Sequence, residues 1–244
     1  MQPTGIIFAV LDCDADSIVA FNRWYDLEHV PPNIALPGVI LGHRYAAPPE
    51  LHALRVTDAS SGFANQRGTF LTIYTLCEPP AETVATMSTV RDRLYAANRM
   101  TFPAEKKIVR DGDAMSFMSG VSASALMLPP EEVPFVGHTA MLVVQRRIDA
   151  ATSAWYRDDW APRVVALAGV HGVATFRSGR ADDVETDLVF FEGDAAAQTR
   201  AIRSAAPAHP AAQILADAPF LLIHPLVYPW ADAIAQSDLP KTIG

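Results

Sequence analysis

The strongest constraint on the fold is an internal repeat, in which the segment 24–45 returns 131 residues later as 155–176. Seven of the 22 aligned positions are identical. The identical pairs are Trp24/Trp155, Tyr25/Tyr156, Pro31/Pro162, Ala35/Ala166, Leu36/Leu167, Gly38/Gly169 and Val39/Val170. Paired aromatic residues and a glycine at fixed spacing are hard to obtain by chance. The repeat therefore indicates two structural units of the same kind.

The segments around both copies follow the same order. Each copy comes after an apolar, strand-like segment and is followed by two further strands, a second helix and a last strand. We expect the second helices at about 80–97 and 194–205, and the last strands at about 114–127 and 217–228. The order β-α-β-β-α-β is that of the ferredoxin-like module, an antiparallel sheet with helices on one face.

The predicted fold class is α+β, with two tandem ferredoxin-like modules in one chain. Each sheet would leave one apolar face bare, and the other half is the obvious cover, so we expect an intrachain dimeric α/β barrel. The modules are predicted at 1–128 and 129–244, joined by the Pro-rich segment 124–137. Only the first half carries a long loop, 46–68, which is either a lid or a surface insertion.

Composition excludes several kinds of partner. The net charge is −8 and the 19 Lys and Arg residues are spread thinly, so we expect no nucleic acid partner. Apolar runs are shorter than the ~20 residues of a membrane span, so no membrane partner is expected. The first residues do not resemble a signal peptide, and the two cysteines lack metal-type spacing, which favours a cytoplasmic protein. Whether two chains form a homodimer stays open.

The segment 21–45 gathers most of the polar and aromatic candidates. We expect its helix to end near His29, because Pro31 disfavours helical backbone at Val30. A helix C-terminus favours a cation and would raise the pKa of the imidazole above its ordinary ~6.5. Tyr25 and Asp26 lie one turn earlier and could orient the ring. A capping role for His29 is the alternative, but the second copy has Trp160 at this position.

The motif F-x-x-W-Y-x-x-x-H-x-P-x-x-x-x-x-P-G, followed by HRY, resembles EthD-like proteins of the dimeric α/β-barrel superfamily. It is carried by Phe21, Trp24, Tyr25, His29, Pro31, Pro37 and Gly38. It is also similar to the methylmuconolactone methylisomerases, in which a histidine eight residues before Pro-Gly lies in the active-site pocket, as His29 lies before Pro37. The second copy lacks the histidine and has Ala168 before Gly169, which puts a second active site in doubt.

The resemblance implies a pocket between the sheet and its helices. It also implies a range of chemistry: cyclisation, lactone isomerisation, lyase reactions, cofactor-free oxygenation and haem-dependent reactions. Fold alone does not choose among them.

Further candidates lie on strands. His43 and Tyr45 point to one face of the strand after the helix, and Arg44 points to the other. If the first face lines the pocket, His43 and Tyr45 join His29 in an acid–base cluster; if the second does, Arg44 supplies a cation for a phenolate, enolate or carboxylate. His138 begins the first strand of the second copy, and His224 lies in an otherwise apolar final strand.

The sequence leads to a cofactor-independent lyase or isomerase/cyclase of aromatic compound catabolism, acting on a small hydrophobic or aromatic substrate without cofactor or metal. The expected catalytic residues are His29, Tyr25 and His43. The expected substrate-binding residues are Phe21, Trp24, Asp26, Glu28, Arg44, Tyr45, His138 and His224. One alternative is an oxygenase, either cofactor-free or with haem bound by His224 or His138. Another is a non-catalytic binding protein for a hydrophobic metabolite.

Overall fold

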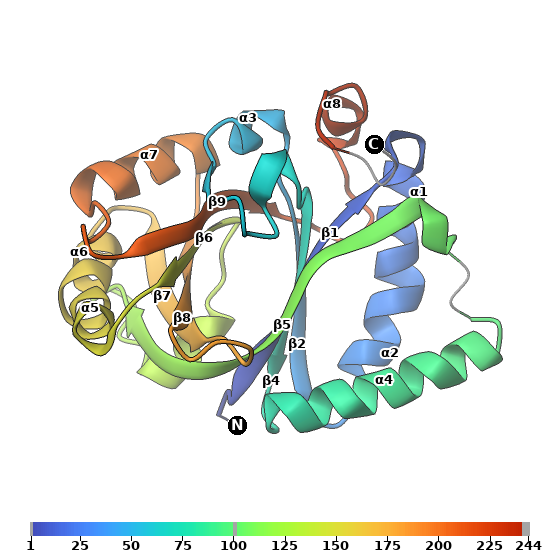
Figure 1. Ribbon diagram of the computed structural model, residues 1–244, viewed down its shortest axis with the longest axis horizontal. Coiled ribbons are helices and arrows are strands. Elements are labelled where there is room, and N and C mark those ends of the chain that lie inside the picture. The colour runs from blue at the N-terminus through green and yellow to red at the C-terminus, as the bar shows by residue number, and fades with distance from the viewer. Residues whose placement is uncertain (1, 100–101, 241–244) are drawn as a thin grey trace.

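The computed structural model describes residues 2–99 and 102–240 (Figure 1). Within these residues, nine strands form one antiparallel sheet, and helices pack on its outer face. The strands are β1 (Gly5–Cys13), β2 (Val39–Ala46), β3 (Val56–Thr57), β4 (Phe70–Leu76), β5 (Lys107–Ser122), β6 (Ala140–Arg147), β7 (Val170–Arg177), β8 (Val184–Phe191) and β9 (Gln213–Leu222). The α+β class is confirmed.

The sheet closes on itself. The strand order is β2-β4-β1-β5 in the first half of the chain and β7-β8-β6-β9 in the second. One seam between the halves joins β5 to β7 along 116–122, and the other joins β2 to β9 through Tyr45 and Ala46 only. The inward-facing side chains are large and apolar, as in the contacts of Phe63 with Phe8 and Phe220. The ring of strands therefore encloses a packed core.

The helices of the two halves lie on opposite sides of this ring (Figure 1). They are α1 (Ile18–Trp24), α2 (Val30–Ile34), α3 (Pro49–His52), α4 (Pro80–Ala96), α5 (Ala150–Trp155), α6 (Ala161–Val165), α7 (Ala195–Ala205) and α8 (Ala231–Ala235). No helix within residues 2–99 and 102–240 has the length and apolar character to cross a membrane.

The helix carrying His29 does not end there. A π-helical turn, Tyr25–His29, connects α1 to α2, and the Val30 amide donates to the Tyr25 carbonyl five residues earlier. The second copy repeats this in Tyr156–Trp160. Pro31 lacks the amide that would close an α-helical bond to Leu27, so the turn widens and the chain then resumes α-helix. The prediction of a helix end at His29 was wrong.

The long loop 46–68 is not a loose surface insertion. It forms α3 and β3, and Leu51, His52 and Phe63 are buried. Arg55 donates to the carbonyls of residues 67 and 68 at 2.8 and 3.0 Å. The loop thus packs against one end of the ring of strands. The last strands also begin earlier than predicted, at Lys107 and Gln213.

Candidate functional site

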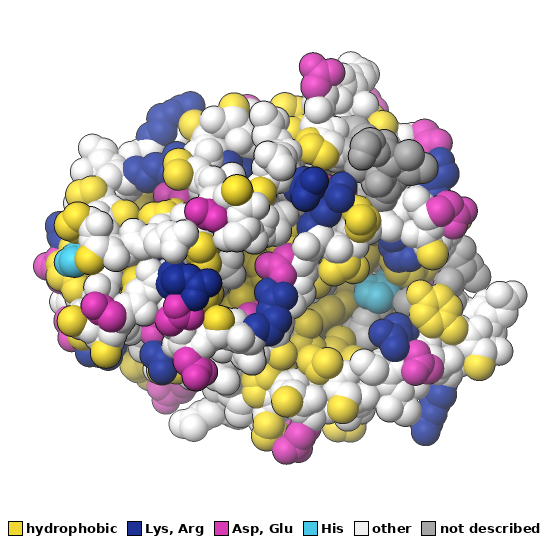
Figure 2. All heavy atoms as spheres, viewed as in Figure 1, with side chains coloured by type: hydrophobic (Ala, Val, Ile, Leu, Met, Phe, Trp, Pro, Cys, Tyr) yellow, Lys and Arg dark blue, Asp and Glu magenta, His cyan; other side chains and the backbone are white. Residues whose placement is uncertain are grey.

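A cavity of about 310 Å³ lies between the outer face of the first-half sheet and helices α1, α2 and α4. In Figure 2 this region is a hollow lined by hydrophobic side chains, with a histidine inside it. The side chains come from two helical segments and three strands: Ile7, Ala9, Leu11, Trp24, Tyr25, His29, Asn33, Thr72, Tyr74, Val84, Met87, Ser88, Arg91, Tyr95, Lys107 and Val109.

Strand alternation builds the floor of this cavity. Ile7 and Ala9 point outward from β1, and their partners on β4 are Tyr74 and Thr72. Residues opposite each other in an antiparallel pair share a face, so these four side chains form one surface. Asn33 donates to the Tyr74 hydroxyl at 3.3 Å and to the His29 carbonyl at 2.8 Å. The floor and the helix that carries His29 are therefore bonded to each other.

The imidazole of His29 lies among aromatic rings. Its centroid is 4.8 Å from that of Trp24 and 4.5 Å from that of Tyr25. Its Nδ1 is buried and has no hydrogen-bond partner among the described residues, which leaves Nε2 as the nitrogen that a ligand can reach. Burial lowers the pKa of His29 to about 4, helped by the positive charges of Arg44 and Lys107. The expected rise of this pKa was wrong, because desolvation outweighs the helix terminus.

Two cations flank this histidine. Lys107 lines the cavity, and its Nζ lies 5.3 Å from the centroid of the Trp24 ring. Partial burial lowers the pKa of Lys107 from its ordinary value. The guanidinium of Arg44 lies behind the cavity, 4.3 Å from the centroid of the Tyr25 ring. Both positive charges disfavour the cationic form of His29.

Arg44 and Asp26 form a buried ion pair behind the cavity. Their side chains are joined at 2.8 Å and are each 5% exposed. Asp26 also accepts from the Tyr228 hydroxyl at 2.5 Å and from the Leu226 amide at 2.8 Å. Asp26 thus holds the C-terminal segment and does not orient His29. Phe21, likewise, packs against Trp24 and Tyr25 without lining the cavity.

His43 and Tyr45 point to the other face of β2, into the ring of strands. The Tyr45 hydroxyl lies 2.9 Å from Nε2 of His138, and the two rings are stacked. Nδ1 of His138 lies 2.8 Å from the Val136 carbonyl, and the His43 centroid is 5.3 Å from that of His138. Burial lowers the pKa of His43 to about 4. The structure therefore separates these three residues from the cavity of His29.

Two further predicted residues also lie elsewhere. Glu28 is exposed on the helical segment, and His224 is exposed on the turn after β9. Lys107, Tyr74 and Asn33 also line the cavity, and the sequence did not predict them. No single motif pointed to them, since they come from separate segments that only the fold brings together.

The second half has a cavity of about 250 Å³ in the corresponding place. Leu142 and Val144 of its first strand line it, together with Tyr156 and Trp160 of its π-helical turn. Nε1 of Trp160 donates to the Ala206 carbonyl at 2.8 Å. The two cavities thus share their framework, but the second has an indole where the first has an imidazole.

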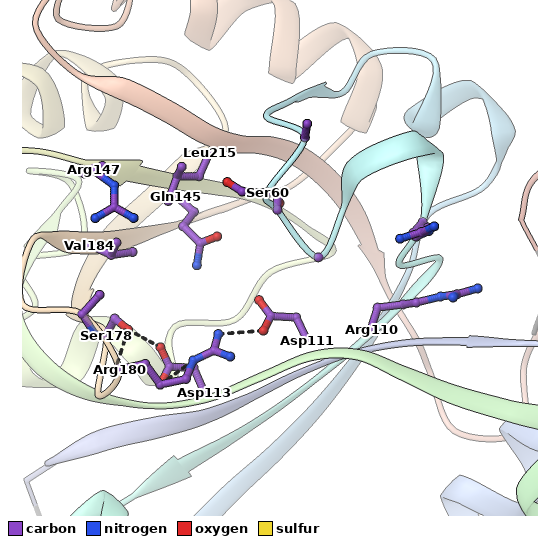
Figure 3. Close-up of a pocket in the computed structure, with 15 residues that line it drawn as sticks. Ser60, Arg110, Asp111, Asp113, Gln145, Arg147, Ser178, Arg180, Val184 and Leu215 are labelled. Atoms are coloured by element: carbon purple, nitrogen blue, oxygen red, sulfur yellow. Dashed lines mark hydrogen bonds and ion pairs between the residues drawn. The ribbon is translucent and has the colours of Figure 1, made fainter.

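A larger cavity, of about 540 Å³, lies at one end of the ring of strands (Figure 3). Its walls are polar, and some of its side chains bind one another: Arg180 donates to Asp111 at 2.6 Å, and Ser178 donates to Asp113 at 2.5 Å (Figure 3). Pockets for small organic molecules are mostly apolar with a few polar groups. The His29 cavity fits that description better.

Haem does not fit the residues that were expected to bind it. Both ring nitrogens of His138 are engaged, by Tyr45 and by the Val136 carbonyl. His224 lies exposed on a turn, outside the His29 cavity. Beside His29 itself the space is taken by the rings of Trp24 and Tyr25, whose centroids lie 4.8 and 4.5 Å from that of the imidazole. Within residues 2–99 and 102–240 no group of His, Cys, Asp and Glu could hold a metal ion.

Comparison with protein-family models and with curated proteins found no match. Solved structures do match. A protein provisionally named a monooxygenase, from Fusobacterium nucleatum, has a TM-score of 0.52 and 8% identity, covering 91% of this chain and 94% of its own. A protein provisionally named a chlorite dismutase has a TM-score of 0.51 and 14% identity, covering 96% and 98%. This chain has the dimeric α/β-barrel fold.

The superfamily resemblance is thereby confirmed at the level of fold, whereas the resemblance to methylmuconolactone methylisomerases finds no support. These two proteins are named for redox reactions, one as a monooxygenase and the other as a chlorite dismutase, and neither is named for elimination, isomerisation or cyclisation. The expectation of a lyase or isomerase was therefore wrong. The oxidative alternative agrees better with these comparisons.

Proposed function

We propose that this protein is a cofactor-free oxygenase of an electron-rich phenol, which binds in the His29 cavity and reacts there with dioxygen. The observation that carries the proposal is a neutral imidazole, with a pKa of about 4, facing an apolar cavity beside Lys107. The oxidative character of the two proteins of similar fold supports the choice of reaction class.

The cavity suits a phenol. Trp24, Tyr25 and Tyr74 supply aromatic walls for a ring, and Nε2 of neutral His29 can accept the phenolic proton. Arg44 and Lys107 disfavour the imidazolium. Lys107, which lines the cavity, can also stabilise a phenolate. Proton transfer creates an imidazolium–phenolate pair, whose attraction offsets the repulsion between the imidazolium and the two cations.

The chemistry after proton transfer needs only dioxygen. The phenolate gives electrons to dioxygen, and a C–O bond forms at a ring carbon that carries hydrogen. Loss of that hydrogen as a proton and cleavage of the O–O bond release water and leave a quinone. One phenol and one dioxygen thus give one quinone and one water. Removing a general base of this kind lowers the rate by about 10²- to 10⁴-fold.

Oxygen uptake with naphthols and alkoxyphenols tests the proposal, with quinone measured by chromatography in the presence of a chelator. We expect quinone and consumed dioxygen in equal amounts, and a loss of at least ~100-fold in His29→Asn. His171→Asn makes the same change on β7, away from the cavity, and should retain the rate within about two-fold. Binding of every phenol without product would identify a binding protein instead, and equal rates in wild type and His29→Asn would contradict the role of His29.

We also propose that 1–128 and 129–244 are two ferredoxin-like modules fused in one chain. The identical strand order of the halves supports this, as does the presence of a π-helical turn after the first strand of each.

A further inference from the structure

A second hollow continues the His29 cavity along the same face of the sheet. It measures about 520 Å³ and lies beside the N-terminal part of α4. Ile7, Ala9 and Val84 line both spaces, so the two form one continuous groove. In Figure 2 the hydrophobic hollow likewise extends beyond the histidine, over the strands of the first half.

Small residues on β5 create this extension. Gly112, Ala114 and Ser116 alternate along the strand and point outward, opposite Ala9, Ile7 and Gly5 of β1. A Cβ added to Gly112 would meet nothing closer than a backbone oxygen at 3.9 Å, so the space above it is open.

Helix α4 does not fill that space. Along its 17 residues only Thr83 is buried, and the side chain of Val84 remains 37% exposed. In the second half α7 buries Ala195, Thr199 and Ile202 within 11 residues. Helix α4 therefore covers the sheet of the first half less completely than α7 covers that of the second half.

The extension is mainly apolar. Pro79, Pro80 and Ala81 form its helical side, and its charged residues, Asp113 and Arg180, lie close together at 3.8 Å. Apolar surface that is continuous with a reaction cavity is best covered by the molecule that reacts there, since one ligand can then bury both parts.

We propose that this groove is a second subsite for an apolar extension of the substrate, and that the substrate is an elongated phenol with its reactive ring at His29. The inference rests on the proposed function, because it assumes that a phenol occupies the first cavity. Beyond that function, the inference specifies that the substrate is long, and that Gly112 and Ala114 select for its length.

Anaerobic binding of para-alkylphenols, from methyl to octyl, tests the subsite without turnover. Affinity, measured by tryptophan fluorescence or calorimetry, should rise about four-fold for each added methylene until the groove is filled. Gly112→Val and Ala114→Leu fill the extension and should remove this rise while keeping methylphenol affinity within about two-fold. Thr86→Leu adds bulk at an exposed position of α4 that does not line the groove and should leave the series unchanged.

The outcomes separate the two proposals. If methylphenol binds and is oxidised but affinity does not change with chain length, the subsite is wrong and the oxygenase stands. If affinity still rises with alkyl length in both Gly112→Val and Ala114→Leu, the alkyl group binds elsewhere, and the subsite is also wrong. If no phenol binds, the proposed function fails, and the subsite fails with it. Circular dichroism and thermal unfolding check that each variant is folded, and Ser116→Leu replaces any variant that is not.

Discussion

The imidazole of His29 lies in a setting that disfavours its cation, and this determines the pH dependence of the reaction. The pKa of about 4 belongs to the free protein, whose ionisations govern kcat/KM. We expect kcat/KM to stay level as the pH falls from 8 to about 5, and to drop only near pH 4. An acid limb near pH 6.5 would show that His29 is solvated like an ordinary histidine.

Lys107 should affect the pH at which kcat/KM falls on the acid side. Its positive charge is one of the causes that lower the pKa of His29, so Lys107→Met should raise this pKa and move the acid limb of kcat/KM to higher pH. Lys106→Met is the matched control, because the neighbouring Lys106 binds Asp14 and Asp16 and does not line the cavity. A limb that moves equally in both variants would point to general surface charge rather than to the site.

The buried pair of Arg44 and Asp26 should matter for stability more than for chemistry. Asp26→Ala leaves a buried guanidinium without its carboxylate and should lower the free energy of unfolding by about 3 kcal/mol in urea titrations. Asp92→Ala removes an exposed partner of Arg91, whose loss should cost less than about 1 kcal/mol. Equal losses in the two variants would argue against a structural role for the buried pair.

Individual residues show where sequence reasoning succeeds and fails. His29 was a candidate because Trp160 occupies the aligned position in the second copy of the repeat. In the structure both residues line cavities. Lys107 and Tyr74 were missed because their place depends on strand register, which the sequence did not specify. The lowering of the His29 pKa was not predicted, because it depends on burial. A helical pattern in the sequence does not show how deeply a side chain is buried.

At the scale of elements, the repeated order of strands and helices followed from the duplicated segment, but the helix end did not. Proline lacks an amide donor, and the sequence does not show whether the chain stops there or widens into a π-turn. In both copies the chain widens into a π-turn.

The π-turn should control the position of His29. Pro31→Ala restores an amide to the Leu27 carbonyl and allows an α-helical register, which turns His29 away from its present place. We expect turnover to fall at least ~10-fold, since small misplacements of catalytic groups are costly. The free energy of unfolding should change by less than about 1 kcal/mol. Pro162→Ala makes the same change in the second copy and should spare turnover; an equal loss there would mean that the effect is global.

At the scale of the whole molecule, the closed ring buries ionisable groups in its interior. His43 and His138 face each other and Tyr45 inside it, and burial lowers the pKa of both histidines, to about 4 for His43. His171, on β7, adds positive charge against His138 when it is protonated. Such groups make the stability of the folded chain depend on pH.

The sign follows from proton uptake. Below pH ~6.5 the unfolded chain binds protons at these positions and the folded chain does not, so the free energy of unfolding should fall as the pH drops from about 6.5 to 4. Each histidine contributes a slope of up to ~1.4 kcal/mol per pH unit in that window. Urea titrations at several pH values measure this slope. His43→Gln keeps a neutral polar side chain and should flatten the slope, relative to its own stability at pH 7. An unchanged slope would mean that His43 takes up its proton in the folded state, and that the ring interior admits water.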